Sequence, residues 1–181
     1  GKGKDWQMML RLRSPGGEIP GKLFISLDEL SDKLGNGTLR ATTRQAFQMH
    51  GIRKDNLKEV IQTIVSAMGS TLAACGDINR NVMAPAAPFE KPEYKTARSL
   101  AIKVADLLTP VAGQGTFLEL WADGDLEYKI KPDKEIQENR KLQFNEHVFS
   151  GIKKEPLYGS TYLPRKFKCA VTVPGDNSVD L

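Results

Sequence analysis

Hydrophobic residues recur at spacings of three and four along two stretches of the chain, which is the pattern of a helix with one buried face. The first stretch covers residues 56–68, and the second covers residues 94–108, where Pro110 ends the pattern. A third stretch, residues 24–34, carries leucines at helical spacing, with Ser26 as its expected N-cap. The pattern therefore predicts three helices.

Alternation of apolar and polar residues, which is typical of a half-buried strand, marks four other segments. They are residues 8–13, 39–50, 116–122 and 167–173. Residues 69–88 are rich in Gly, Ala, Asn and Pro and are expected to form a loop, whereas residues 123–156 are expected to be a long surface excursion. The order strand, helix, strand, helix predicts an α+β fold with a ferredoxin-like half-domain over residues 1–68.

The segment LRATTRQAFQMHG has an unusual polar face. If the segment is an extended strand, its even positions share one side: Arg40, Thr42, Arg44, Ala46, Gln48 and His50. A solvated surface is the ordinary explanation for such a row, because surface cations are common. Arginine, however, binds carboxylate and phosphate through two parallel hydrogen bonds, so an internal strand of this composition needs an anion. A multi-carboxylate cofactor, an oxyanion substrate and a nucleic-acid backbone all remain open at this point.

Cations at alternate positions also occur in two other strand-like segments, and one arginine stands between two asparagines in the Gly-rich loop. These residues are Arg11 and Arg13, Lys166 and Lys168 after Arg165, and Arg80 between Asn79 and Asn81. Each pair alone is compatible with a wet strand face. Together they predict that basic side chains from distant segments meet.

Composition narrows the class of protein. With 26 basic and 22 acidic residues the net charge is +4, a mild excess that suits an anionic partner without requiring one. Apolar residues make up 40% and no apolar run is long enough to cross a bilayer, so a soluble protein is expected. Aromatic residues do not alternate with the basic ones on the polar face, which argues against a binder of single-stranded nucleic acid.

Cys75 and Cys169 are far apart and match no metal-binding spacing. Two buried free thiols are expected, with a disulfide left open. A lone histidine such as His50 is typically a hydrogen-bonded structural residue, and His147 receives no role. Because the chain starts Gly-Lys-Gly-Lys and stops where an alternating pattern begins, a fragment of a longer protein is expected.

Four sequence strings resemble, in the same order and at similar separations, the first half of the assimilatory sulfite reductase hemoprotein family. The strings are MLRLRSPGG, TLRATTRQAFQMHGI, STLAACGDINRNVMAPAAPF and YGSTYLPRKFKCAVTVPGDNSVD, and the likeness is strongest to the ferredoxin-dependent form of plastids and cyanobacteria. Four motifs in register are a more specific signal than one short motif. The resemblance implies that residues 69–181 are the truncated N-terminal part of a siroheme-binding nitrite/sulfite reductase domain.

The resemblance also implies two cofactors. Enzymes of this family use siroheme, a reduced porphyrin with eight carboxylates, bridged through a cysteine sulfur to a 4Fe-4S cluster, and reduce sulfite to sulfide with six electrons. By resemblance, the siroheme contacts are Arg40, Thr42, Arg44, Gln48 and His50, with Asn81 and Arg165 as weaker candidates. The family's four cluster cysteines lie in its other half, and neither Cys75 nor Cys169 matches them. The chain alone is therefore predicted to hold no cluster and to be inactive.

The family's substrate cage of two arginines and two lysines falls here on Arg11, Arg80, Lys166 and Lys168. Arginine stays charged and orients an oxyanion, whereas lysine can also deliver protons when neighbouring cations lower its pKa. The two lysines are thus the expected proton donors for sulfite reduction.

Two alternative functions stay open. Ferredoxin-nitrite reductase shares fold and cofactors, but the TTRQ-x-FQ-x-HG string and the lysine pair favour sulfite. A basic nucleic-acid-binding module would place the same arginines on phosphates, and the low net charge argues against it. The resemblance to the plastid and cyanobacterial form implies ferredoxin as the electron donor, and Lys153 and Lys154 are candidates for its docking surface. No nucleotide fingerprint occurs, so NADPH is not expected to bind here. The expected location is the plastid stroma in a eukaryote or the cytoplasm in a cyanobacterium, with no membrane partner.

Overall fold

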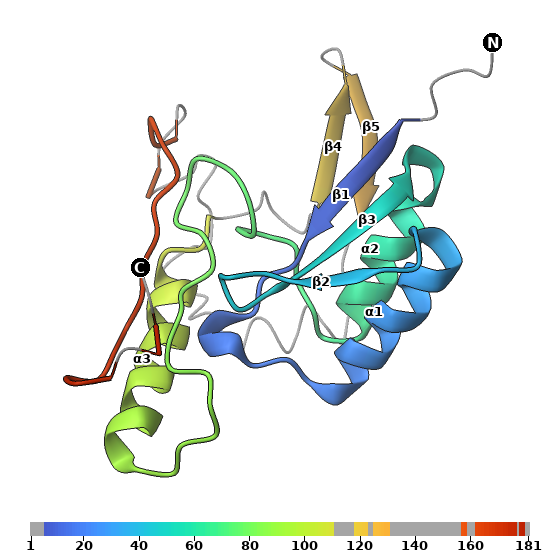
Figure 1. Ribbon diagram of the computed structural model, residues 1–181. Coiled ribbons are helices and arrows are strands. Elements are labelled where there is room, and N and C mark those ends of the chain that lie inside the picture. The colour runs from blue at the N-terminus through green and yellow to red at the C-terminus, as the bar shows by residue number, and fades with distance from the viewer. Residues whose placement is uncertain are drawn as a thin grey trace.

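The structure is a computed structural model that describes residues 6–110, 118–122, 125–130, 157–158, 162–176 and 178–179. Its elements, in chain order, are β1 (Gln7–Arg11), the 3₁₀ turn η1 (Pro15–Gly17), α1 (Gly21–Leu34), β2 (Leu39–Ala41), β3 (Phe47–Arg53), the 3₁₀ turn η2 (Lys54–Asn56), α2 (Leu57–Ser66), α3 (Pro92–Leu107), β4 (Leu118–Ala122) and β5 (Asp125–Ile130). Figure 1 shows how they are arranged.

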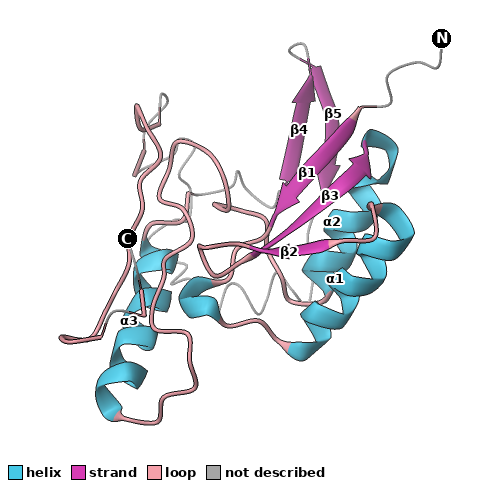
Figure 2. Ribbon diagram, in the orientation of Figure 1, coloured by secondary structure: helices cyan, strands magenta, loops and turns pink. Residues whose placement is uncertain are grey.

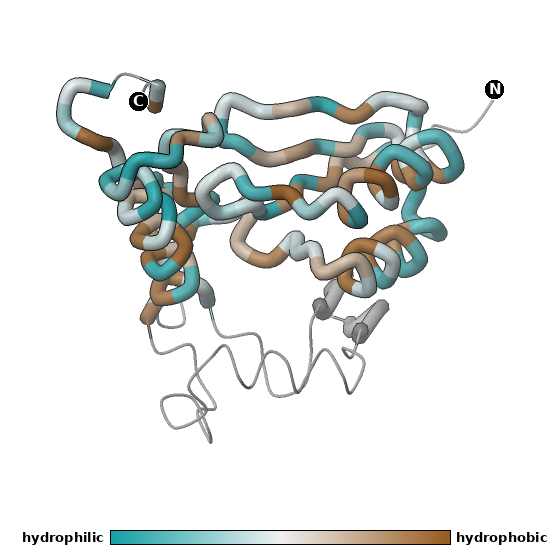
Figure 3. Tube along the Cα trace, turned by 90° about the horizontal axis from the view of Figure 1, so that it is seen from below, coloured by the Kyte–Doolittle hydropathy of each residue, from teal (hydrophilic) through white to brown (hydrophobic). Residues whose placement is uncertain are grey.

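Strands β1, β3 and β2 form an antiparallel sheet in that order, and helices α1 and α2 cover one of its faces (Figure 1). Two inward side chains of β3, Met49 and Ile52, are fully buried in one core with leucines of α1 and the apolar face of α2. Burying a side chain of this size contributes on the order of 2 kcal/mol. This core therefore dominates the stability of the sheet and of the two helices that cover it. Figure 3 shows hydrophobic and hydrophilic residues alternating around the helical turns, as expected for helices with one buried face.

Gly51 allows two residues of β3 that are three positions apart to face the same core. The register of β1 and β3 shifts by one residue between Met8↔Ile52 and Leu10↔Met49, which is a β-bulge. Gly51 lies at this bulge with a φ of 79°, in the left-handed region that favours glycine. A Cβ at this position would also meet a Cβ of the loop after α1 at 2.7 Å. Backbone and space therefore both require glycine here.

Helix α1 begins earlier than the pattern predicted. The carbonyl of Pro20 accepts the first helical hydrogen bond, from Phe24 N at 3.0 Å, so Ser26 lies inside the helix and the prediction that it is the N-cap is wrong. Leu23 is buried and extends the apolar spacing by one turn. The other two predicted helices are confirmed as α2 and α3, with ends shifted by one or two residues.

The segment LRATTRQAFQMHG is not one strand, contrary to the prediction. Short strand β2 pairs with β3 in a hairpin, with Arg40 opposite Gln48. The turn between them is closed by hydrogen bonds from Thr42 N to Ala46 O at 2.8 Å and from Gln45 N to Thr42 O at 3.0 Å. Gln45 has a φ of 56°, which no strand allows. Because Thr-Thr-Arg-Gln contains no Gly, Asn or Pro, the sequence carries no turn signal at this place.

The predicted strand at residues 167–173 is also wrong. This segment runs beside the loop after α2 but meets it only at two isolated parallel bridges, Asn79↔Phe167 and Met83↔Ala170. The bridges lie four positions apart on one segment (79 to 83) and three on the other (167 to 170), so the register shifts and no continuous ladder forms. Figure 2 draws both segments as loops. The loop predicted at residues 69–88 is confirmed.

Helix α3 packs on this pair of segments through small side chains. Ala101 and Ala105 are fully buried in a second core with Val82 and Ala84, and Cys169 packs against it. Alanine leaves room for the extended backbone to approach the helix closely, which is why a helix with few large apolar residues still has a buried face.

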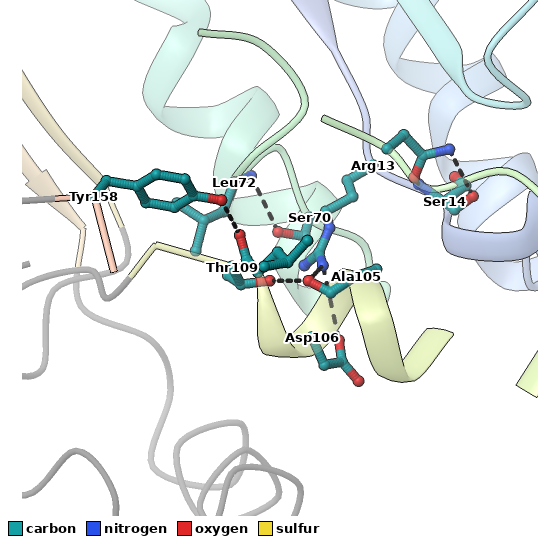
Figure 4. Close-up of polar contacts among 10 residues, drawn as sticks. Arg13, Ser14, Ser70, Leu72, Ala105, Asp106, Thr109 and Tyr158 are labelled. Carbon is teal, nitrogen blue, oxygen red and sulfur yellow. Dashed lines mark hydrogen bonds and ion pairs between the residues drawn. The ribbon is translucent and has the colours of Figure 1, made fainter. Parts of the chain in front are cut away.

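Arg13 ties the end of the sheet to the C-terminal end of α3 (Figure 4). Its Nη2 donates to Ala105 O at 2.5 Å and lies 3.8 Å from Asp106 Oδ1, while its backbone N donates to Ser70 O at 2.9 Å. Burial lowers the pKa of Arg13, and Asp106 opposes that change. The sequence placed Arg13 on one face with Arg11, but the strand ends at Arg11 and Arg13 turns to the helix. That pairing is therefore wrong.

Tyr158 holds the same helix end from the other side (Figure 4). Its hydroxyl donates to Leu108 O at 2.5 Å and accepts from Asn79 N at 3.2 Å. Thr109 Oγ1 donates to Ala105 O at 2.7 Å. Carbonyls that the helix leaves without partners are thus satisfied, and the loop residue Asn79 is fixed relative to α3.

The predicted strand at residues 116–122 is confirmed as β4, which forms an antiparallel hairpin with β5. Strand β5 (Asp125–Ile130) falls within the predicted surface excursion, where the sequence predicted no strand. The remainder of the excursion, with His147, Lys153 and Lys154, lies outside the described residues. Within the described ranges, no helix has the length and apolar character needed to span a membrane.

Gly51→Ala is expected to lower the free energy of unfolding by about 2–5 kcal/mol. Alanine at this φ costs roughly 1–2 kcal/mol, and relieving the contact with Asn36 adds about 1–3 kcal/mol. Urea unfolding of the chain followed by circular dichroism measures the loss. Gly21→Ala is the matched control, because no atom lies within 4 Å of its Cβ position, and it is expected to be neutral or slightly stabilising. Equal losses in both variants would contradict this account of the bulge.

Arg13→Met is expected to lower the free energy of unfolding by about 1–3 kcal/mol, because a charged donor to a helix carbonyl is lost. Lys95→Met is the control: it breaks the ion pair with Glu90, whose side chains are 59% and 84% exposed, and is expected to cost at most about 0.5 kcal/mol. The same urea experiment measures both. If the exposed pair proves as costly as Arg13, the proposed tie between the sheet and α3 has no special role in stability.

Candidate anion-binding site

The basic face is built across the sheet rather than along one strand. Arg11 of β1 and Arg40 of β2 both pair with Gln48 of β3, so the three side chains share the sheet face opposite to the helices. With its amide oxygen toward Arg11, Gln48 accepts hydrogen bonds from Arg11 Nη2 at 2.7 Å and Nε at 2.8 Å. Its amide nitrogen then faces His50 Nε2 at 3.4 Å. Four of the predicted site residues therefore lie in one polar row.

Arg44 extends from the hairpin turn beside this row. Burial lowers the pKa of Arg44, and Arg80 and Arg11 lower it further. Thr42, another predicted site residue, stabilises the turn by accepting a hydrogen bond from Arg44 N at its Oγ1, at 3.3 Å. Ala46, which the sequence placed on the polar face, is instead buried, because the turn breaks the alternation.

The C-terminal segment brings Lys166 and Lys168 to Arg80. Phe167 N donates to Ile78 O, and Phe167 O accepts from Arg80 N, both at 3.0 Å. The two lysines flank Phe167 in the chain, so they point to the opposite side, which also carries Arg80. A hydrogen bond of 3.0 Å from the Nε of this arginine to a loop carbonyl fixes its direction.

Cations from several segments lower the pKa of Lys166. Its pKa is lowered by Arg165 first, then by Lys168 and Arg80, with smaller effects of burial and of Arg44. The hairpin turn, the loop after α2 and the C-terminal segment therefore all contribute charge at one place. We call the following residues the cationic cluster: Arg11, Arg44, Arg80, Arg165, Lys166 and Lys168.

Among the residues that the structure describes, no cation of this cluster forms an ion pair with a carboxylate; the ion pairs found there lie elsewhere. Arg44 Nη1 is buried and has no hydrogen-bond partner in the same ranges. A buried charged donor without a partner is costly, and its cost falls when an acceptor binds. The geometry therefore calls for an anionic ligand.

Asn81, predicted as a weaker cofactor contact, has its side chain committed within the protein. Its Nδ2 donates to Ser14 O at 2.9 Å and to Arg44 O at 2.7 Å, and its Oδ1 accepts from Ser14 N at 2.9 Å. The residue is 2% exposed. Asn81 therefore joins three segments around Arg44 instead of presenting donors to a ligand.

Gln45 was missed by sequence reasoning. Its Nε2 donates to Ala84 O at 2.6 Å and its Oε1 accepts from Ala84 N at 3.1 Å. The sequence did carry one signal: Gln45 is a polar residue on the face of the segment that was expected to cover a core. A polar residue in such a place needs hydrogen-bond partners, and the structure shows them in Ala84.

Both cysteines are free, but Cys75 is exposed, so the prediction of two buried thiols is wrong for this residue. Its Sγ lies 3.4 Å from Arg11 Nη1, at the edge of the cationic cluster. Burial raises the pKa of Cys169, which packs against the core under α3. In the described part of the chain, no three residues of the metal-ligating kinds come together.

The sequence of the chain is similar to sequences of known nitrite and sulfite reductases. Residues 2–67 match the family described as "Nitrite/Sulfite reductase ferredoxin-like half domain". The chain is 58% identical over its full length to the ferredoxin sulfite reductase of Synechococcus elongatus. It is 42% identical over 98% of its length to the NADPH sulfite reductase hemoprotein beta-component of Methylobacterium nodulans, and 40% identical over 97% to that of Bacillus subtilis. It spans 28%, 26% and 27% of these three proteins.

Among solved structures, the Mycobacterium tuberculosis NirA protein shares the fold. The TM-score is 0.53 over 92% of this chain and 22% of that chain, at 21% sequence identity. The identities to sulfite reductases, together with the family match, confirm the resemblance drawn from the four sequence strings. The chain is similar along its whole length to a ferredoxin-dependent sulfite reductase, and its residues 2–67 carry the ferredoxin-like half domain of nitrite and sulfite reductases.

Proposed function

We propose that the chain is part of a ferredoxin-dependent sulfite reductase and contributes the cationic wall of its siroheme and sulfite site. The observation that carries the proposal is the cationic cluster, in which a buried guanidinium nitrogen of Arg44 has no partner among the described residues. Similarity to sulfite reductases over the full chain supports the same conclusion.

The residues of the polar row fit a polycarboxylate tetrapyrrole. Arg40 and Arg44 would bind carboxylates of siroheme, with Gln48 and His50 as further hydrogen-bonding groups, and Thr42 would keep the turn in place. Bound siroheme supplies the iron at which the sulfur oxyanion is reduced. An octacarboxylate needs many cations around it, and the guanidinium of Arg44 supplies a positive charge that no carboxylate of the described residues pairs with.

The four cage residues would hold sulfite. Arg11 and Arg80 would orient the oxygens of the anion through their guanidinium groups. Lys166 and Lys168 add charge and carry protons at Nζ, which each oxygen leaving sulfur as water requires. Neighbouring cations lower the pKa of Lys166, which favours release of its proton.

The remaining parts of such an enzyme belong outside the described residues. By resemblance, the 4Fe-4S cluster is bound by cysteines in the larger remainder of the protein, and ferredoxin delivers the electrons; the name of the Synechococcus relative supports that donor. The division into residues 1–68 and 69–181, the docking of ferredoxin at Lys153 and Lys154, and a stromal or cyanobacterial cytoplasmic location stay proposals. The chain alone is still predicted to hold no cluster and to be inactive; a stable cluster absorption band from the chain expressed with siroheme would refute this.

Replacing cage residues in the full-length enzyme tests the proposed function. Arg80→Met and Lys168→Met are each expected to lower kcat/KM for sulfite by about 10²–10³-fold, because charge stabilisation at the oxyanion is lost. Lys33→Met, on the surface of α1, is the control and should leave kcat/KM unchanged. The assay uses reduced ferredoxin with sulfite and with nitrite. Preference of the unmodified enzyme for nitrite would favour the nitrite reductase alternative, and full activity of Arg80→Met would refute the cage.

The pH dependence of kcat/KM tests Lys166. Because neighbouring cations lower its pKa from the ordinary 10.5, the ammonium group loses its proton, and its charge, at a lower pH than an isolated lysine. We expect kcat/KM for sulfite to fall as pH rises through this pKa. Arg165→Gln removes the largest lowering effect and is expected to move the fall to higher pH, whereas Lys33→Gln should not move it. An alkaline limb that is identical in all three enzymes would exclude Lys166 as the titrating group.

A further inference from the structure

Two carboxamide side chains hold the hairpin turn that carries Arg44. Asn81 pairs with both backbone polar groups of Ser14 and donates a third hydrogen bond to Arg44 O at 2.7 Å. Gln45 pairs in the same manner with both backbone polar groups of Ala84, at 2.6 and 3.1 Å. Each side chain thus occupies the place of a backbone amide in a strand ladder. The peptide unit that follows Arg44 is anchored from two sides.

Gln45 has an unfavourable backbone conformation for a residue with a side chain. Its φ of 56° is in the left-handed region, where glycine fits without strain. Its Cβ also closes against the η1 turn, since a Cβ on Gly17 would lie 3.4 Å away from it. Glycine at position 45 would relieve the strain but lose both hydrogen bonds to Ala84. The glutamine is therefore best explained by what its side chain binds.

Arg44 is a residue that needs such a restraint. Its guanidinium lies near Arg11 and Arg80, which repel it, and its buried Nη1 has no acceptor among the described residues. A free turn would swing outward and let the guanidinium reach water and separate from the other cations. The two carboxamides oppose that movement without adding a negative charge.

We propose that Gln45 is a positioning residue that, together with Asn81, holds Arg44 inside the cationic cluster, ready to bind a carboxylate of the tetrapyrrole. The identity of that anion rests on the proposed function. Gln45 itself is not a catalytic residue, because both polar atoms of its amide are hydrogen-bonded to the backbone of Ala84. Its effect on the cofactor passes through the placement of Arg44.

Gln45→Gly in the full-length enzyme separates positioning from stability. The variant removes the clasp on Ala84 while relieving the backbone strain, so the melting temperature is expected to stay close to that of the unmodified enzyme. Siroheme is expected to leave about tenfold faster, measured by visible absorbance in the presence of excess heme-scavenging protein. Met68→Gly is the matched control: Met68 has a φ of 65° and is 60% exposed, so glycine gives the same backbone relief without touching the site.

A double-mutant cycle with Arg44→Met shows whether the effect passes through Arg44. If it does, adding Gln45→Gly to Arg44→Met changes the rate of siroheme loss little beyond that of Arg44→Met alone. Two independent, multiplying effects would overturn the proposal, and so would a Gln45→Gly enzyme that retains siroheme normally or melts far below the unmodified enzyme. Full-length enzyme that binds no siroheme at all would instead refute the proposed function.

Discussion

Repulsion among like charges is the constraint on which the rest of this structure depends. Arginines and lysines from four distant segments lie close enough to lower the pKa of Arg44 and of Lys166, and they have no carboxylate partner in the described ranges. Without a bound anion, the repulsion between these charges raises the free energy of the arrangement. The fold must therefore supply attachments that do not depend on charge.

Those attachments are hydrogen bonds between backbones and neutral side chains. The loop carrying Arg80 is fixed to the C-terminal segment through Phe167, and to the end of α3 through Tyr158 and Asn79. The hairpin turn carrying Arg44 is fixed to the same loop by Asn81. Arg80 and Arg44 are consequently placed by the attachment of their own backbones rather than by an ion pair with a described carboxylate.

The sequence predicted the regular elements well wherever one face was buried in a large core. Helix α2 and strand β1 follow from their apolar spacing, because burial of that spacing decides their structure, whereas α3 buries only alanines. Two segments were wrongly predicted to be continuous strands. The hairpin turn at Gln45 carries no turn residue, and the segment at Phe167 alternates like a strand although its register with the loop shifts by one residue. Both outcomes depend on tertiary hydrogen bonds that no local pattern encodes.

The sequence predicted which residues form the candidate site, but not which residues hold them in place. Resemblance to sulfite reductases named the cations of the cluster, and the structure brings these cations together, although their roles stay proposals. Arg11 and Arg13 show what spacing alone misses: two positions apart, one donates to Gln48 in the polar row and the other to a carbonyl at the end of α3. The strand ends between them, so the alternation that would pair them no longer applies.

The use of carboxamides rather than carboxylates around Arg44 has a physical reason. A carboxylate at position 45 or 81 would hold the turn by pairing with the nearest guanidinium, and each such pair would cancel one positive charge of the cluster. It would also compete with an incoming anion for the same donors. Glutamine and asparagine provide both a donor and an acceptor, so they can clasp a backbone N–H and C=O together while leaving the electrostatic potential unchanged. The proposed binding of a polyanion and a small oxyanion at one site is therefore best served by neutral carboxamides that hold the backbone and by cations without carboxylate partners.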